Sequence, residues 1–185
     1  MNHSGQFVIS LVLLLLAATG YLVALATTSW SISGRLLVFG LWQYCFLDTK
    51  PDGEKIWKCL TNNTDFTMVS QAFSILAVMC YFVAFLLYVA SVLLPSLHRC
   101  RPMIMALCLL TFCIVSLQIM SMVVFGVKIG HYFKKLEDKH FEISLEPLTI
   151  SWSSTIGIIS NILATAAGVC LFLELRNVAM EELNV

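Results

Sequence analysis

Two cysteines, Cys45 and Cys59, offer the clearest chemistry in this 185-residue chain, because they flank a predicted turn at equal distances. Segment 36–47 is rich in strand-forming residues, Pro51-Asp52-Gly53 supplies turn residues, and 54–60 predicts a return strand. A hairpin folded at Asp52 sets the two thiols opposite each other, within reach of a disulfide. Two free thiols in a reducing compartment are the alternative. A disulfide persists only in an oxidising space, so the hairpin favours an extracellular loop.

Catalytic and metal chemistry find no support in the residue pattern. The four histidines are scattered without metal-ligand spacing, and the sequence contains no glycine-rich phosphate loop and no Gly-x-Ser-x-Gly motif. The predicted membrane spans lack charged residues away from their ends, whereas proton relays and ion pathways usually need them. We therefore expect a protein that is not an enzyme, binds no metal and needs no cofactor.

Three further sites concern modification or docking. Asn62-Asn63-Thr64 is a glycosylation sequon with Asn62 as the acceptor, on the same side as the hairpin. Cys100, between two arginines beside a span, is a predicted palmitoylation site. The final residues Leu183, Asn184 and Val185 form a hydrophobic-x-hydrophobic pattern that would suit strand addition to a cytosolic PDZ scaffold.

The composition indicates that membrane helices must position these sites. Hydrophobic residues make up 59% of the chain and charged residues only 12%, where soluble domains average roughly 25% charged. A soluble domain of this length cannot hide so much apolar surface, which excludes a soluble enzyme and a disordered regulator. The 11 basic and 11 acidic residues cancel, so no strong field attracts nucleic acid.

Four charge-poor windows are each long enough to cross a bilayer, which takes about 20 residues. We expect one tetraspan domain, 1–185, with spans over about 7–28, 68–95, 102–127 and 148–173. The first window is longer than a signal-peptide core and has no basic leader, so it is expected to be retained. The loops 29–67 and 128–147 share the extracellular face, and both termini are cytosolic in a multi-pass plasma-membrane protein.

Polar and small residues within the spans predict how the helices pack. Gln71, Gln118 and Asn161 are expected to form hydrogen bonds between helices. Two stripes of small residues recur at four-residue spacing and allow close approach, either within the bundle or to a partner helix: Gly20, Ala24 and Thr28, and Ser160, Ala164 and Gly168. The mixed charge run 134–139 predicts a solvated helix extension, with a partner-docking face as the alternative.

Trp30, Gly40-Leu41-Trp42, Cys45 and Cys59 together resemble the W…GLW…C…C motif of the claudin superfamily. That superfamily includes the epithelial membrane proteins, peripheral myelin protein, the lens fibre intrinsic membrane protein and the calcium-channel gamma subunits. Segment 71–76 resembles the opening of the second span in the epithelial membrane proteins, and 150–153 resembles the start of the fourth span in the lens fibre branch. True claudins usually carry an arginine at the second span's entry, which this chain lacks. The chain is therefore more similar to the epithelial-membrane and lens-fibre branch.

The resemblance implies an all-α transmembrane four-helix bundle capped by a small extracellular antiparallel β-sheet. It implies that Trp30, Gly40, Leu41 and Trp42 anchor this sheet on the outer rim of the bundle, while the cysteines form the loop disulfide. We expect the strands of the first loop to pair with a strand from 141–145.

The expected function is that of a non-enzymatic membrane protein that organises cell–cell contacts or membrane domains, including cell junctions, through the stapled loop. Phe39, Phe46 and Trp57 are the predicted contact residues, because aromatic anchors dominate interface energies. The expected partners are the lipid bilayer and copies of the protein, in cis or in trans. The alternative is an auxiliary, gamma-like subunit that docks on an ion channel or receptor and modulates it.

Overall fold

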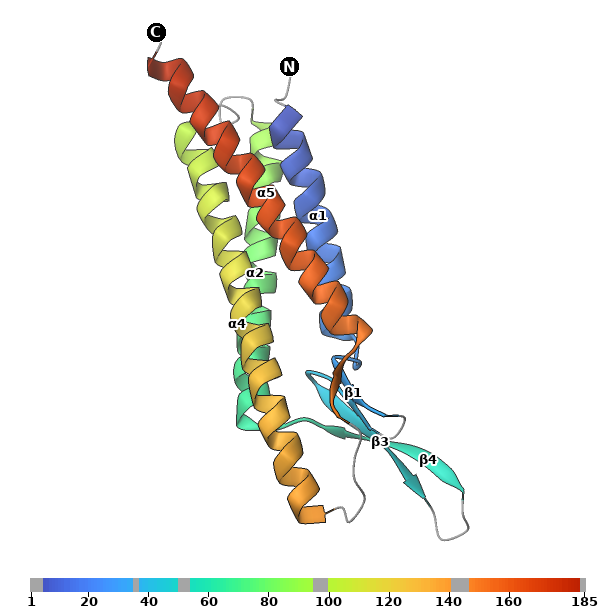
Figure 1. Ribbon diagram of the computed structural model, residues 1–185. Coiled ribbons are helices and arrows are strands. Elements are labelled where there is room, and N and C mark those ends of the chain that lie inside the picture. Colours follow the sequence, from blue (N-terminus) through green and yellow to red (C-terminus); the bar gives the residue numbers. More distant parts are fainter. Residues whose placement is uncertain (1–4, 35–36, 50–53, 95–99, 141–146, 184–185) are drawn as a thin grey trace.

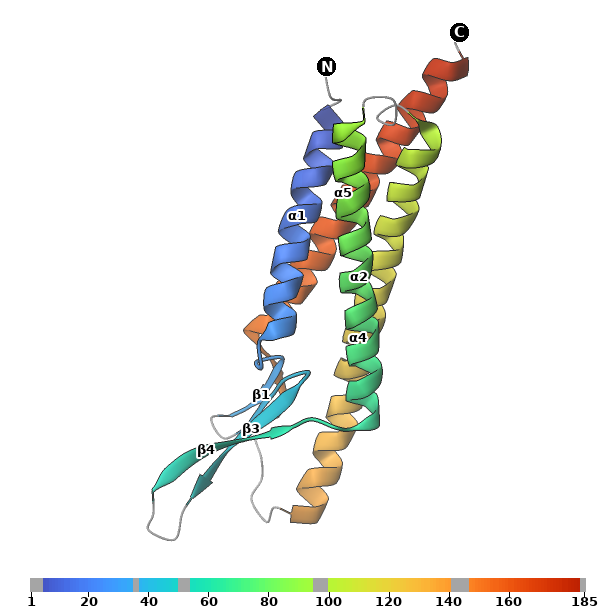
Figure 2. The ribbon, with the colours of Figure 1, turned by 180° about the vertical axis from the view of Figure 1, so that it is seen from behind.

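The computed structural model describes residues 5–34, 37–49, 54–94, 100–140 and 147–183, without the side chains of Thr49, 133–140 and 181–183. Within these residues, four long helices run side by side: α1 (Gly5–Ala26), α2 (Asp65–Leu93), α4 (Arg101–His140) and α5 (Trp152–Leu183) (Figure 1). Each contains a segment long and apolar enough to cross a membrane. Gly5 and Leu183 lie at the end of the bundle opposite the sheet (Figures 1 and 2). The four-span prediction is confirmed.

Two helices differ from their predicted bounds on the sheet side. α4 continues to His140, well past the predicted end of the third span at 127, so the charge run 134–139 is helical as expected. The fourth helix begins at Trp152 rather than at 148, because Thr149–Ile150 forms a strand, β5. α4 therefore extends beyond the start of α5 alongside the sheet (Figure 1).

An antiparallel sheet with the strand order β4-β3-β2-β1-β5 lies at this end. Its remaining strands are β1 (Ser31–Ser33), β2 (Leu37–Phe39), β3 (Gln43–Thr49) and β4 (Lys55–Thr61). Gly34, at φ 55°, adopts a backbone conformation that favours glycine directly after β1. The predicted fold class, a transmembrane bundle with a small antiparallel sheet, is confirmed.

One detail of the predicted sheet needs correction. The single strand expected over 36–47 is broken into β2 and β3, because the chain reverses at Gly40-Leu41-Trp42. The strand expected over 141–145 lies outside the described residues; within them, the second loop contributes β5. β5 pairs with β1 through Ser31↔Ile150 and Ile32↔Thr149.

The small-residue stripes pack inside the bundle, where α1 runs along α5. A Cβ added to Gly20 would collide with the Ser160 hydroxyl, and one added to Gly157 would lie 2.7 Å from Met122 Cε. Ala24 and Ala164 are both completely buried. Helices approach this closely only where such small residues meet, and the resulting van der Waals contacts stabilise membrane bundles.

Hydrogen bonds between side chains also link the helices. Gln118 donates its amide to the Tyr81 hydroxyl (3.1 Å), which confirms one of the three predicted interhelical contacts. Gln71 instead donates to the Leu41 carbonyl (2.9 Å) and so binds the turn between β2 and β3 rather than another helix. The Asn161 side-chain oxygen is buried and accepts no hydrogen bond within the described part of the chain.

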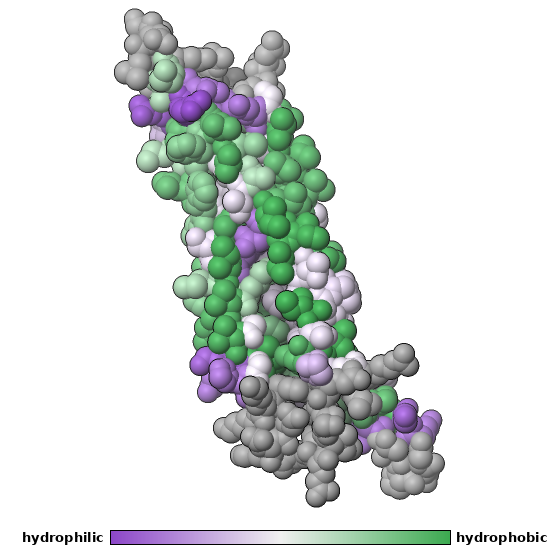
Figure 3. Space-filling model, in the orientation of Figure 1, coloured by the Kyte–Doolittle hydropathy of each residue, from purple (hydrophilic) through white to green (hydrophobic). Residues whose placement is uncertain are grey.

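On the face seen in Figure 3 the bundle surface is mainly hydrophobic, with a small hydrophilic patch near mid-height and hydrophilic residues at both ends. Large apolar side chains such as Met79, Phe82 and Ile162 point outward from it. In water such a surface would be strongly unfavourable, whereas hydrocarbon accommodates it. The lipid bilayer is the environment that this surface requires.

Candidate interaction surface on the stapled sheet

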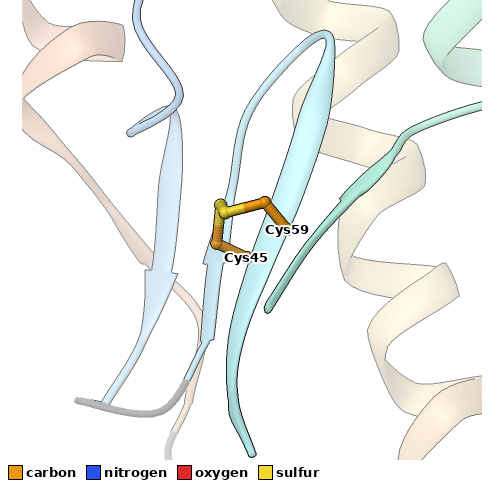
Figure 4. The surroundings of a disulfide bond; sticks show 2 residues. All are labelled: Cys45 and Cys59. Carbon is orange, nitrogen blue, oxygen red and sulfur yellow. A yellow bond between two sulfur atoms is a disulfide. The ribbon is translucent and has the colours of Figure 1, made fainter. Parts of the chain in front are cut away.

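The disulfide joins the two longest strands at directly opposed positions. Cys45 pairs with Cys59 in the register of β3 and β4, with their Cα atoms 4.0 Å apart (Figure 4). The two cysteines are separated by 14 residues, a loop whose closure contributes about 3 kcal/mol in the chain-entropy model. The predicted symmetric hairpin is therefore present. Its turn, Pro51-Asp52-Gly53, lies outside the described residues.

Gly40 allows the sheet to approach the end of α1. A Cβ at this position would lie 2.7 Å from Thr28 Cα and 2.8 Å from the Thr28 carbonyl oxygen. These are backbone atoms, so the conflict cannot be relieved by rotating a side chain. Leu41, the next residue, is completely buried, and its carbonyl accepts the Gln71 hydrogen bond. The reversal between β2 and β3 is thus held against both α1 and α2.

Two indole rings hold the sheet to the last turn of α1. Trp30 Nε1 donates to the Ala24 carbonyl (2.8 Å), and Trp42 Nε1 donates to the Leu25 carbonyl (2.9 Å). The final carbonyls of a helix lack backbone partners within the helix. Trp42 supplies a donor to the Leu25 carbonyl, and Trp30 shares the Ala24 carbonyl with the Thr27 hydroxyl (3.1 Å). The structure therefore shows how the residues of the W…GLW motif anchor the sheet.

A second hydrophobic core lies between the sheet and α4. The Trp30 ring packs edge-on against Phe125, with centroids 5.3 Å apart. Phe39 is only 1% exposed and packs beside Tyr44, with centroids 5.9 Å apart. The prediction of Phe39 as an exposed contact residue is therefore wrong. The Phe39 side chain points from β2 into this core. The apolar run 36–47 does not indicate which side of the strand is buried.

The β3–β4 hairpin projects away from the bundle (Figures 1 and 2). Trp57 is 52% exposed and Leu60 is 50% exposed, while Phe46 is half-buried. Trp57 and Leu60 point to opposite sides of the sheet because side chains alternate along a strand. β4 is an edge strand that pairs only with β3 among the described strands. Its other edge therefore presents backbone donors and acceptors that a further strand can bind.

The predicted glycosylation acceptor is part of this anchor. Asn62 is 3% exposed, and its side-chain nitrogen donates to the Gly40 carbonyl (3.2 Å). Its side-chain oxygen accepts a hydrogen bond from the Thr64 hydroxyl (3.3 Å). A glycan attached to this nitrogen is incompatible with the folded arrangement. The structural role of Asn62 was missed at the sequence level, where the sequon was its only visible signal.

The remaining predicted sites lie far from the sheet. Cys100 is half-buried, takes no part in the disulfide and lies directly before α4; its palmitoylation stays a prediction. At the chain's end, Asn184 and Val185 lie outside the described residues, as does the side chain of Leu183. Among the described residues, no group of three or more histidine, cysteine or acidic side chains is placed to hold a metal ion.

No protein-family model matches the chain, and no curated protein matches it. The architecture is nonetheless claudin-like. It combines four long apolar helices with a disulfide-bonded sheet whose strands lie mainly between the first and second helices.

Proposed function

We propose that the protein organises cell–cell contacts or membrane domains without catalysing a reaction. The observation that carries the proposal is the exposed edge of the hairpin, where β4 displays Trp57 and Leu60. Exposed aromatic side chains on a rigid element are typical anchors of protein interfaces. The disulfide fixes β4 to β3, which lowers the entropy that the hairpin loses on binding.

The occupant of this edge is a second copy of the protein, on the same membrane or on a facing one. An exposed strand edge binds another strand through backbone hydrogen bonds, and two identical edges can pair antiparallel about a twofold axis. Lys58 forms a salt bridge with Asp48 on the neighbouring strand, so its charge is partly balanced within the hairpin. The disulfide favours an extracellular position for this surface.

The test is the distribution of tagged protein in co-cultured fibroblasts that lack claudins. We expect enrichment where two expressing cells touch, and loss of enrichment in Trp57→Ala. Trp152→Ala is the matched control, because Trp152 is 51% exposed against 52% for Trp57 but lies at the start of α5. Even distribution of the wild-type protein over the cell surface would overturn the adhesion proposal.

A second candidate function, an auxiliary subunit of a channel or receptor, is favoured by Asn161. Asn161 lies within the α5 span and is half-buried: its side-chain oxygen is enclosed in the bundle, but the residue keeps part of its surface exposed on the apolar helix. Intramembrane amides bind partner helices through hydrogen bonds. Mild-detergent pulldown should recover a stoichiometric channel partner from the wild type and lose it in Asn161→Leu. Recovery of only the protein itself would contradict this function.

A further inference from the structure

A groove of about 770 Å³ opens between α2 and α4 at the sheet-side end of the bundle. Asp65 and Lys128 lie in its wall together with the aromatic residues Phe66 and Tyr132. Val69 and Val124 also line it, each about one helical turn further into the membrane than the corresponding charged residue. The groove therefore changes from charged to apolar along the direction of the membrane normal.

The two charged side chains are available to a ligand. Both Asp65 and Lys128 are exposed, and neither forms an ion pair with another described residue. Lys128 is the first charged residue that α4 presents after its apolar span, and Asp65 is the first residue of α2. Both therefore lie where the hydrocarbon region ends and lipid headgroups begin.

The aromatic residues form a corner beside these charges. The Phe66 and Tyr132 rings lie with centroids 5.7 Å apart at an interplanar angle of 55°. Both are half-buried and so keep part of their surface open to the groove. Aromatic faces attract cations, and quaternary ammonium groups are bound in this way by aromatic side chains.

We propose that this groove binds one zwitterionic, choline-containing phospholipid from the leaflet on the sheet side. Lys128 binds the phosphate, as lysine commonly does as a compact positive charge. Asp65 and the Phe66–Tyr132 corner bind the quaternary ammonium, and the acyl chains lie along Val69 and Val124. One negative and one positive side chain match the zwitterion, whereas an anionic lipid would meet repulsion from Asp65. The proposal requires only membrane insertion and is independent of the adhesion function.

Asp65 has a second physical role that the test must separate from lipid binding. A carboxylate in the first turn of a helix stabilises that helix through its dipole. This effect needs neither Lys128 nor the aromatic corner. Lipid selectivity, rather than stability alone, is therefore the property to measure.

The experiment is native mass spectrometry of the purified full chain in detergent, with added dioleoyl phosphatidylcholine or dioleoyl phosphatidylglycerol. We expect one retained phosphatidylcholine per protein and weaker binding of phosphatidylglycerol. Lys128→Gln should weaken phosphatidylcholine binding about tenfold, the loss expected for one charge-assisted hydrogen bond. Asp65→Asn should weaken phosphatidylcholine and strengthen phosphatidylglycerol, because it removes the repulsive carboxylate.

Lys55→Gln is the matched control, since Lys55 is an exposed lysine on β4 outside the groove, and it should leave lipid binding unchanged. A phosphatidylcholine with a photoreactive acyl chain should label the peptides that contain Val69 or Val124. Equal lipid binding by wild type, Lys128→Gln and Asp65→Asn would overturn the proposal. So would a preference of the wild type for phosphatidylglycerol, or labelling confined to other parts of the bundle.

Discussion

Trp30 and Trp42 cap the same helix: their indole nitrogens donate to consecutive carbonyls in the last turn of α1, those of Ala24 and Leu25. Trp30 is buried against α4, whereas Trp42 is 38% exposed. The sheet is therefore attached to α1 through one buried ring and one exposed ring. This attachment fixes the direction in which the hairpin projects.

Removing the indole donors should destabilise the protein unequally. Trp30→Phe leaves the Ala24 carbonyl without this donor and opens space beside Phe125, so we expect a loss of about 2–4 kcal/mol in the free energy of unfolding. Trp42→Phe should cost about 1 kcal/mol, because its site is more exposed. Thermal unfolding in detergent measures both. Trp152→Phe is the control and should change stability by less than about 0.5 kcal/mol; equal losses in all three variants would contradict the capping role.

Gly40→Ala should push the sheet away from α1, because the added methyl meets the backbone of Thr28. Overpacking of this kind costs about 1–3 kcal/mol. Gly130→Ala is the matched control, since a Cβ there has nothing within 4 Å and the change favours the helix. The midpoint of thermal unfolding should fall for Gly40→Ala and stay level or rise for Gly130→Ala. The same midpoint for Gly40→Ala as for wild type would show that the close approach is not required.

Reduction of the disulfide should loosen the hairpin while leaving the bundle folded. The hairpin has little core of its own, and its staple contributes about 3 kcal/mol. Trypsin should therefore cleave after Lys55 or Lys58 faster in Cys45→Ser/Cys59→Ser than in the oxidised wild type. Circular dichroism should show unchanged helix content in the variant. Equal cleavage rates with and without the disulfide would contradict its stabilising role.

Asn62 should remain unglycosylated in the folded protein, because its amide nitrogen is buried and bound to the Gly40 carbonyl. Treatment with a glycosidase should leave the electrophoretic mobility of the protein from secretory cells unchanged. Asn62→Asp removes the amide donor and places a charge in a buried site, so it should destabilise by about 2 kcal/mol or more. Asn63→Asp, at an exposed position, is the matched control and should have little effect. A mobility shift abolished by Asn62→Gln would contradict this reading of the site.

Local sequence features were sufficient to predict the helix bundle and the disulfide of the sheet. Apolar length alone identifies a membrane span, because hydrocarbon thickness fixes how many residues must be apolar. The pairing of Cys45 with Cys59 followed from a hairpin with a short-range turn, where register depends on neighbouring residues. Gly20 and Ser160 were also recognisable, since small residues at four-residue spacing lie on one side of a helix.

Contacts between distant segments decided the rest. Phe39 belongs to a run of apolar residues, and hydrophobicity does not distinguish a side chain that faces α4 from one that faces a partner. The same limit applies to β5, which pairs with Ser31, and to Gln71, which binds Leu41. Both contacts form only when the sheet packs against the helices. Asn62 has no local pattern that predicts burial, because its hydrogen bond to Gly40 exists only after the chain has reversed and returned to α2. Burial of polar groups depends on such non-local partners, so the tertiary structure alone could assign them.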